Sequence, residues 1–259
     1  MASNVFTVED LSFAYNENTR IFENLNLTLT EGVVTTLIGA NGSGKSTLFN
    51  LMTKNLKPNS GRIFLRGGEV SMIRLRDFAR LVAIVHQTNT APADLSVERL
   101  VEYGRFPHRQ FGTSSGTDED DLMVAWALET CGLTEYKDKP AASLSGGQRQ
   151  RAWIAMALAQ GTDVLLLDEP TTYLDVRYQL DILRLVRRLN REFGLTVVMV
   201  LHDINQSLYY SDEIVALSNG TVLDQGKPES VITESLVSEV YKVDLDVTSI
   251  NGKPFVLAV

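Results

Sequence analysis

The chain has 259 residues, of which 44% are hydrophobic, and carries a formal net charge of -8 at pH 7. This composition predicts a globular protein with one large core, or a core with an attached subdomain. The acidic balance argues against a nucleic-acid partner, because sequence-independent binding needs a basic surface. No apolar run approaches the roughly 20 residues that cross a bilayer, and the N-terminus lacks the parts of a signal peptide, so we expect a cytoplasmic location.

The first third of the chain has the residue pattern of β-strands. Alternating or apolar stretches occur at 5–8, 25–29 and 61–65, and a stretch of valine, threonine, leucine and isoleucine lies at 33–38. The stretch at 33–38 has the pattern of a buried strand. The other three would form an antiparallel flank around it.

A glycine-rich loop follows the strand predicted at 33–38, and residues 46–52 have the pattern of a helix that leaves it. The loop fits the phosphate-loop pattern, in which glycines let backbone N–H groups close around phosphate oxygens at a helix N-terminus. A glycine turn before a surface helix would look similar, but the flanking strand and helix favour a nucleotide site. Lys45 would then reach the β- and γ-phosphates, and the Ser46 hydroxyl would bind Mg²⁺. The nucleotide-binding residues predicted here are Gly39, Ala40, Asn41, Gly42, Ser43, Gly44, Lys45, Ser46 and Thr47.

Helical periodicity interrupts the strand pattern after an apolar strand predicted at 81–85. From about residue 96 to 144 it predicts an inserted helical subdomain. Within it, Thr117 is a plausible N-cap, and the acidic run 118–121 fits a first helical turn, where carboxylates complement the helix dipole. We interpret that run as a solvated helix start. The sequence therefore predicts a single domain over 1–259, with its core at about 1–95 and 145–259 and the helical subdomain at about 96–144.

The pattern of a parallel sheet resumes with apolar strands at 164–168 and 196–201, each preceded by a predicted helix. This βαβ order places chemistry at the carboxyl ends of the strands. Asp168 and Glu169 come at the end of the first strand. Asp168 suits a contact to Mg²⁺, and Glu169 is placed to polarise the water that attacks ATP. Such a pair could also be a solvated turn, but the upstream phosphate loop favours the site.

The pentapeptide Leu144-Ser145-Gly146-Gly147-Gln148 matches in full the signature motif of one family. With it, essentially the whole chain resembles the nucleotide-binding subunit of an ATP-binding-cassette (ABC) transporter. The resemblance implies an α/β fold with a phosphate-loop NTPase core, a parallel sheet, an antiparallel β flank and an inserted helical subdomain. It also implies a homodimer, in which two ATP molecules are each held by the phosphate loop of one subunit and the signature of the other. Ser145 and Gly147 would contact the γ-phosphate bound by the partner subunit's Lys45.

Four further residues take roles from this resemblance. Gln87 resembles the family's sensor glutamine, which reaches the Mg²⁺ and the attacking water. His202 resembles the switch histidine that contacts the γ-phosphate, and Asp175 matches the loop that crosses the dimer interface. Tyr15 occupies the place of the aromatic residue that stacks on adenine. The implied catalytic residues are Glu169, His202, Gln87 and Lys45, and the implied metal-binding residues are Ser46, Gln87 and Asp168.

The type of cassette protein follows from features that the chain lacks. It contains no fused membrane domain, no long coiled coil and no second cassette, which leaves an importer subunit that works with separate membrane permease subunits at the cytoplasmic face of the membrane. An extracytoplasmic substrate-binding protein would act on it only through the permease.

The stretches at 103–108 and 170–175 resemble ferric-siderophore import ATPases, with cobalamin and haem importers as close alternatives. A soluble cassette protein of iron–sulfur cluster assembly is a rival hypothesis, in which ATP serves as a dimerisation switch. The presence of both Glu169 and His202 favours turnover over switching.

Overall fold

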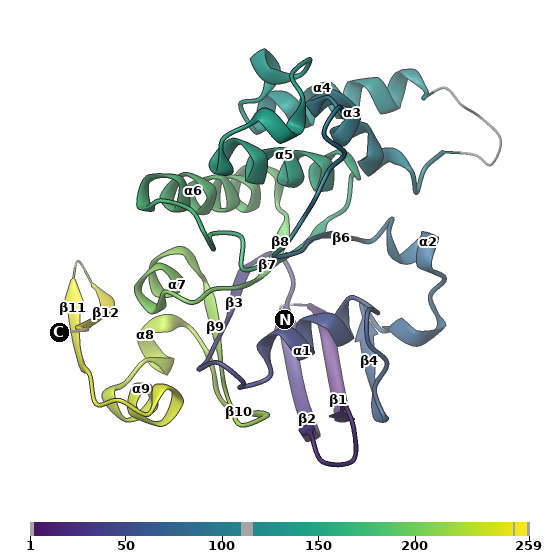
Figure 1. Ribbon diagram of the computed structural model, residues 1–259. Coiled ribbons are helices and arrows are strands. Elements are labelled where there is room, and N and C mark those ends of the chain that lie inside the picture. Colours follow the sequence, from purple (N-terminus) through teal and green to yellow (C-terminus); the bar gives the residue numbers. More distant parts are fainter. Residues whose placement is uncertain (1–2, 110–115, 251, 258–259) are drawn as a thin grey trace. The chain divides into compact units, whose positions relative to one another are not determined.

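A computed structural model describes residues 3–109, 116–250 and 252–257 (Figure 1). The chain divides into two compact units, one formed by Met1–Ile73 with Thr196–Val259 and the other by Arg74–Leu195. Within the described ranges, no helix is long and apolar enough to cross a membrane.

The first unit contains the antiparallel sheet that the sequence predicts for the N-terminal third. Val8 of the strand Asn4–Ala14 lies opposite Leu27 on one side and Ile63 on the other, and all three side chains are buried. Since successive side chains of a strand point to opposite faces, such pairs put one face of the sheet in the core. In spatial order the strands are β2 (Arg20–Thr30), β1 (Asn4–Ala14), β4 (Ser60–Leu65) and β5 (Gly68–Glu69).

The same unit contains four strands of a mostly parallel sheet. Their spatial order is β10 (Thr221–Gly226), β9 (Glu213–Ser218), β3 (Val34–Ile38) and β8 (Thr196–Val200). Strand β3 is parallel to both β8 and β9, and every residue of β3 and β8 is buried. Strands covered on both faces need β-branched and aliphatic residues throughout, which is why the sequence identifies β3 and β8 well.

The remaining elements of the first unit are mostly short helices. They are α1 (Lys45–Met52), η1 (Val70–Met72), α7 (Ile204–Tyr210), α8 (Pro228–Val231) and α9 (Glu234–Tyr241), followed by the hairpin of β11 (Asp246–Ile250) and β12 (Lys253–Leu257).

The second unit combines two parallel strands with helices. Strands β6 (Val82–Val85) and β7 (Val164–Asp168) pair with Val85 opposite Leu167. Helices and short 3-10 turns occupy the stretch predicted as a helical subdomain at about 96–144, and the limits of that subdomain stay a prediction. The elements in this stretch are α3 (Val97–Glu102), η2 (Tyr103–Arg105), α4 (Asp118–Thr130), η3 (Thr134–Tyr136) and η4 (Ala141–Ser143). Outside it, the second unit contains α2 (Leu75–Phe78), α5 (Gly146–Ala159) and α6 (Val176–Phe193).

Thr117 is the N-cap of helix α4 as predicted, but the acidic first turn of the helix is not wholly solvated. Thr117 and Asp120 form a reciprocal capping box. The Asp120 carboxylate also accepts a hydrogen bond of 2.7 Å from Arg105 Nε, and only 4% and 6% of the Arg105 and Asp120 side chains are exposed. Burial alone would raise the pKa of Asp120, but its hydrogen bonds with Thr117 and Arg105 lower it below the usual value. The interpretation of 118–121 as a solvated helix start is therefore wrong for Asp120, which holds α4 to the turn η2.

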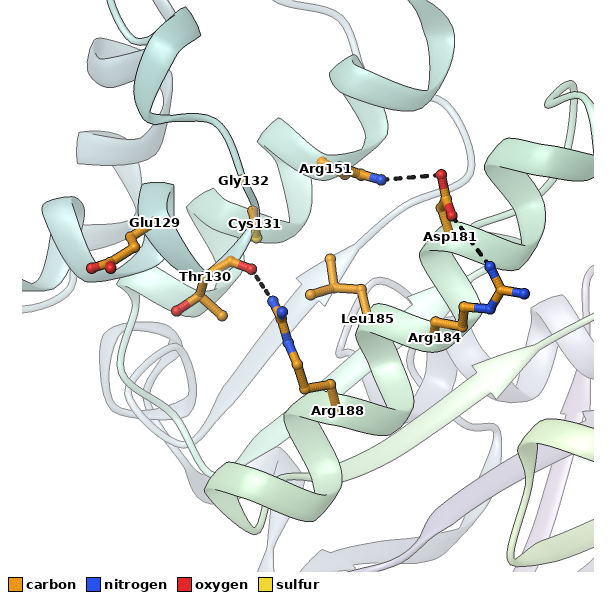
Figure 2. Close-up of a pocket in the computed structure, with 9 residues that line it drawn as sticks. All are labelled: Glu129, Thr130, Cys131, Gly132, Arg151, Asp181, Arg184, Leu185 and Arg188. Atoms are coloured by element: carbon orange, nitrogen blue, oxygen red, sulfur yellow. Dashed lines mark hydrogen bonds and ion pairs between the residues drawn. The ribbon is translucent and has the colours of Figure 1, made fainter.

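Helices α5 and α6 are linked by an ion pair. The Arg151 Nη2 atom of α5 lies 3.3 Å from Asp181 Oδ2 of α6, and Figure 2 shows the two side chains facing each other. Asp181 also lies 3.6 Å from Arg184, one turn along the same helix.

Candidate functional site

The phosphate loop in the first unit needs its glycines. Gly44, the residue before α1, has φ 106°, and a Cβ there would lie 2.8 Å from the Phe22 ring. A Cβ on Gly39 would lie 2.4 Å from the carbonyl oxygen of Leu217 and 2.5 Å from Ser43 Oγ. Both positions therefore combine a left-handed backbone with close neighbours, a combination that only glycine tolerates.

Lys45 is folded back over this loop. Its side chain is buried, and its Nζ donates hydrogen bonds of 2.8 Å to the Gly39 carbonyl and 3.0 Å to the Ala40 carbonyl. The first turn of α1 contains no acidic residue, so the positive end of the helix dipole is not neutralised there. A buried ammonium next to a helix N-terminus is an arrangement that receives phosphate oxygens.

Tyr15 lies beside the first turn of α1. Its hydroxyl is 3.2 Å from Thr47 Oγ1, and its ring packs edge-on against Phe13 with centroids 5.0 Å apart. The Tyr15 residue is 55% exposed. The structure thus brings Tyr15 next to the predicted loop and leaves part of its ring accessible to a base.

His202 emerges at the same edge of the parallel sheet as the phosphate loop. In the parallel pair of β3 and β8, Leu37 lies opposite Val200, so Gly39 and His202 follow at equivalent positions. His202 is exposed, and the next residue, Asp203, caps α7 by accepting a hydrogen bond of 2.9 Å from the Gln206 N–H.

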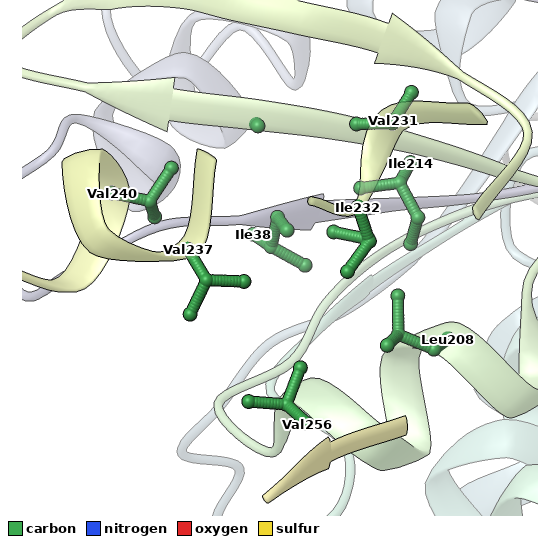
Figure 3. Close-up of a cluster of buried hydrophobic side chains, with 9 residues drawn as sticks. Ile38, Leu208, Ile214, Val231, Ile232, Val237, Val240 and Val256 are labelled. Atoms are coloured by element: carbon green, nitrogen blue, oxygen red, sulfur yellow. The ribbon is translucent and has the colours of Figure 1, made fainter. Parts of the chain in front are cut away.

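The strand that leads into the loop is anchored by the C-terminal part of the chain. Ile38, the last residue of β3, belongs to a buried cluster with Val237 and Val240 of α9 and Val256 of β12 (Figure 3). Tyr241, at the end of α9, packs against this cluster. Burial raises the pKa of Tyr241 to about 12, although a hydrogen bond with the Gly39 backbone acts in the opposite direction. Sequence reasoning missed this tyrosine, because it lies outside every motif.

In the second unit, the structure brings Gln87 and Glu169 together. Glu169 directly follows β7, has φ 49° and is 8% exposed. Its carboxylate Oε2 accepts a hydrogen bond from the Gln87 side-chain amide and another of 3.0 Å from Thr172 Oγ1. Asp168, the last residue of β7, is 9% exposed. Sequence reasoning missed Thr172, which sits in the turn three residues after the glutamate and could have been suspected from that spacing.

The pentapeptide 144–148 forms the start of α5. Ser145 is the N-cap, and its backbone N–H donates a hydrogen bond of 3.0 Å to Gln148 Oε1, while the Gln148 N–H donates one of 3.4 Å to Ser145 Oγ. Leu144 and Gly147 are buried, and Ser145 and Gly146 are exposed. The motif therefore presents a capped helix N-terminus at the surface of the second unit.

The loop at 171–175 ends at Asp175, the N-cap of α6. Asp175 is exposed, and Tyr173 is 91% exposed with φ 63°. The Gln179 side-chain amide donates a hydrogen bond of 2.9 Å to the Leu174 carbonyl, which fastens the loop to the first turn of the helix.

Three features of the chain together define an ATP-binding cassette. They are a phosphate loop at a helix N-terminus, a buried glutamate that a glutamine holds by a hydrogen bond, and a second capped helix that begins with the full signature sequence. The sequence pattern of the ABC transporter family matches residues 22–172, and the chain belongs to this family. It is an ATPase domain with the fold predicted from its sequence.

Curated relatives include iron-import proteins. The chain is 45% identical to the iron(3+)-hydroxamate import ATP-binding protein of Bacillus subtilis, over 95% of this chain and 91% of the relative. It is 43% identical to a petrobactin import ATP-binding protein of Bacillus anthracis, over 97% and 92%. Among solved structures, it is similar to a dimeric ATP-binding cassette in a post-hydrolysis state with ADP and Pi, with a TM-score of 0.72 and 28% identity over 86% of this chain and 98% of that one.

Proposed function

We propose that this chain is the ATP-hydrolysing subunit of an importer of ferric siderophores, and that it energises uptake through separate permease subunits. The assignment of ferric siderophores as the cargo rests on the 45% identity to an iron(3+)-hydroxamate import protein over 95% of the chain. The observation that carries hydrolysis is the buried Glu169 carboxylate, which is oriented by both Gln87 and Thr172.

In the proposed binding step, the phosphate loop and Lys45 hold the triphosphate. Backbone N–H groups at the start of α1 and the Lys45 ammonium neutralise charge on the phosphate oxygens. The Tyr15 ring stacks on the base, an interaction typically worth about 1–3 kcal/mol for aromatic residues on bases. The hydroxyl of Ser46, the amide oxygen of Gln87 and the carboxylate of Asp168 are oxygen donors of the kind that Mg²⁺ prefers, so these three residues would hold the ion.

Mg²⁺ supplies charge neutralisation between the phosphates when it is bound. In the proposed hydrolysis step, Glu169 orients a water molecule and takes its proton as the water oxygen attacks the γ-phosphorus and ADP leaves. The two hydrogen bonds to Oε2 restrict the rotation of the carboxylate, which lowers the entropic cost of reaching the transition state. His202 would donate a hydrogen bond to a γ-phosphate oxygen, where negative charge develops.

The signature acts in the opposite subunit of a head-to-tail homodimer in this proposal. A helix N-terminus favours anions, and α5 presents one that is capped by Ser145 and open to solvent at Gly146. Ser145 Oγ and the Gly147 N–H would contact the γ-phosphate held by the partner subunit's Lys45, while Leu144, which is buried, and Gln148 fix the helix start. Asp175 would lie at the same dimer interface.

The membrane partner would dock near Gln87. The segment 88–93 follows the glutamine directly and is largely exposed, so movement of Gln87 on nucleotide binding could be passed to a helix of the permease. In this proposal the ATPase lies at the cytoplasmic face of the membrane, and an extracytoplasmic binding protein affects it only through the permease.

Two experiments test the proposal. Lys45→Ala and Ser145→Arg should each be nearly inactive as ATPases, but a mixture should recover activity, because a heterodimer has one intact composite site. In cells, deletion of the gene should abolish uptake of radiolabelled ferric siderophore, and Lys45→Ala should not restore it. If the deletion strain takes up siderophore normally but has lost cobalamin or haem uptake, only the assignment of the cargo is overturned. Normal hydrolysis by the signature variant would refute the head-to-tail site.

A further inference from the structure

We propose that Tyr178 and Asp181 of α6 and Arg151 of α5 brace the signature helix to the Asp175 loop, so that each subunit offers these two segments to its partner as one rigid element. The inference rests on the proposed function, since both segments are assigned there to the opposite subunit. It concerns how the two segments keep their relative position, which the proposed function leaves open.

The first contacts of this brace are made by the two glycines of the signature. A Cβ on Gly146 would lie 3.2 Å from the Leu174 side chain, and a Cβ on Gly147 would lie 2.4 Å from the Tyr178 ring. Leu174 lies in the loop just before the N-cap of α6, and Tyr178 lies in the first turn of that helix. The absence of side chains at 146 and 147 therefore lets the signature sit directly on the loop of its own subunit.

The ion pair continues the same line of contact. Asp181 is three residues after Tyr178, and Arg151 is four residues after Gly147, so the pair lies one turn further along both helices. Arg151 Nη2 is 3.3 Å from Asp181 Oδ2, with 30% and 26% of the two side chains exposed. The contacts at Leu174, Tyr178 and Asp181 thus fix both the spacing of α5 and α6 and the position of one along the other.

Asp181 has a second partner that provides a matched control. Arg184 lies 3.6 Å from the same carboxylate, but it belongs to the same helix as Asp181 and its side chain is 67% exposed. Both arginines line a hollow of about 260 Å³ (Figure 2), so both pairs are open to water. Only the Arg151 pair joins the two helices, and only its loss should change how the signature and the Asp175 loop are held.

The test measures ATP-driven dimerisation in a Glu169→Gln background, which hydrolyses ATP slowly. Without the ion pair, the two segments of each subunit must be ordered as the dimer forms. Exposed ion pairs have modest strength and a symmetric dimer contains the brace twice, so we expect Arg151→Gln to raise the dimer dissociation constant by about 2- to 30-fold. Arg184→Gln should change it by less than about twofold, and Arg151→Lys, which keeps the charge, should recover most of the loss. Binding of a fluorescent ATP analogue to the monomer should be unchanged in all three variants.

The outcomes separate the brace from the proposed function. Equal dimerisation of Arg151→Gln and Arg184→Gln overturns the brace, as does a loss of ATP binding by the Arg151→Gln monomer, which would indicate general structural damage. Ser145→Arg in the same background tests the use of the signature in the opposite subunit. If Ser145→Arg blocks dimerisation and Arg151→Gln does not weaken it, the brace fails and the proposed function stands. If Ser145→Arg dimerises normally, both fail.

Discussion

Replacement of Glu169 by glutamine removes a carboxylate from a buried position with almost no change in shape. The wild-type carboxylate accepts hydrogen bonds at Oε2 from the Gln87 amide and from the Thr172 hydroxyl, the latter at 3.0 Å. A glutamine can place its carbonyl oxygen at the same point and accept both. We therefore expect Glu169→Gln to keep the local structure and lose the proton acceptor.

The expected loss of hydrolysis rate is much larger than the expected loss of stability. Loss of a general base typically slows a reaction by about 10²–10⁴-fold, or roughly 3–5 kcal/mol in the barrier. The two hydrogen bonds would change from a charged to a neutral acceptor, at a cost of about 1 kcal/mol each. The free energy of unfolding should therefore fall by no more than about 2 kcal/mol, and the positive φ of residue 169 adds nothing, since Glu and Gln share the same backbone cost.

Phosphate release at saturating ATP and Mg²⁺ measures the hydrolysis rate, and thermal unfolding measures the stability. With ATP, the variant should also elute as a dimer in size-exclusion chromatography, because it binds nucleotide without turning it over. Thr172→Val serves as a control that removes one orienting hydrogen bond and keeps the base, and it should lose only about fivefold in rate, which is roughly 1 kcal/mol. Release by Glu169→Gln within tenfold of the wild type would refute the assignment of Glu169 as the base.

Three further predictions concern single side chains. Tyr15→Ala should weaken ATP binding by about 5- to 150-fold in a titration with a fluorescent analogue, whereas Tyr15→Phe keeps the ring and should stay close to wild type. Asp120→Asn leaves Arg105 buried without its counter-charge and should lower the free energy of unfolding by about 3–5 kcal/mol in urea denaturation at pH 7. Because the folded pKa of Asp120 is lowered, its stabilisation is complete above the unfolded value of about 4 and is lost as the pH falls through the folded pKa, so the gap between variant and wild type should close in acid. Gly147→Ala places a methyl group against Tyr178 and should cost about 1–3 kcal/mol of stability, seen as a lower Tm; an unchanged Tm would contradict the packing of the signature on α6.

The sequence predicts those parts of the fold whose pattern is local. Strand β3, the phosphate loop and α1 follow one another within about 20 residues, and each has its own signal: a buried apolar run, glycines and a helical pattern. The place of Glu169 directly after a buried strand could be predicted for the same reason, and its role as the base stays a prediction. The capping box at Thr117 was partly visible as an N-cap followed by acidic residues.

The parts that could not be predicted depend on contacts between distant segments. Nothing near Asp120 in the sequence indicates that Arg105 buries it, since a run of four acidic residues usually marks a solvated helix start. The approach of Tyr178 to Gly147 and of Tyr241 to Gly39 depends on how helices pack, and neither tyrosine lies in a motif. A single sequence carries no signal for such pairs, because only the fold brings the two residues together.

The cluster around Ile38 has a consequence for synthesis on the ribosome. Ile38 precedes the phosphate loop, yet it shares its core with Val256, almost the whole length of the chain away. Domains usually fold from the N-terminus while translation continues, but this side of the strand is not fully covered until Val256 has left the exit tunnel. A nascent chain should therefore reach its full affinity for nucleotide only after Val256 has emerged from the ribosome and joined this cluster.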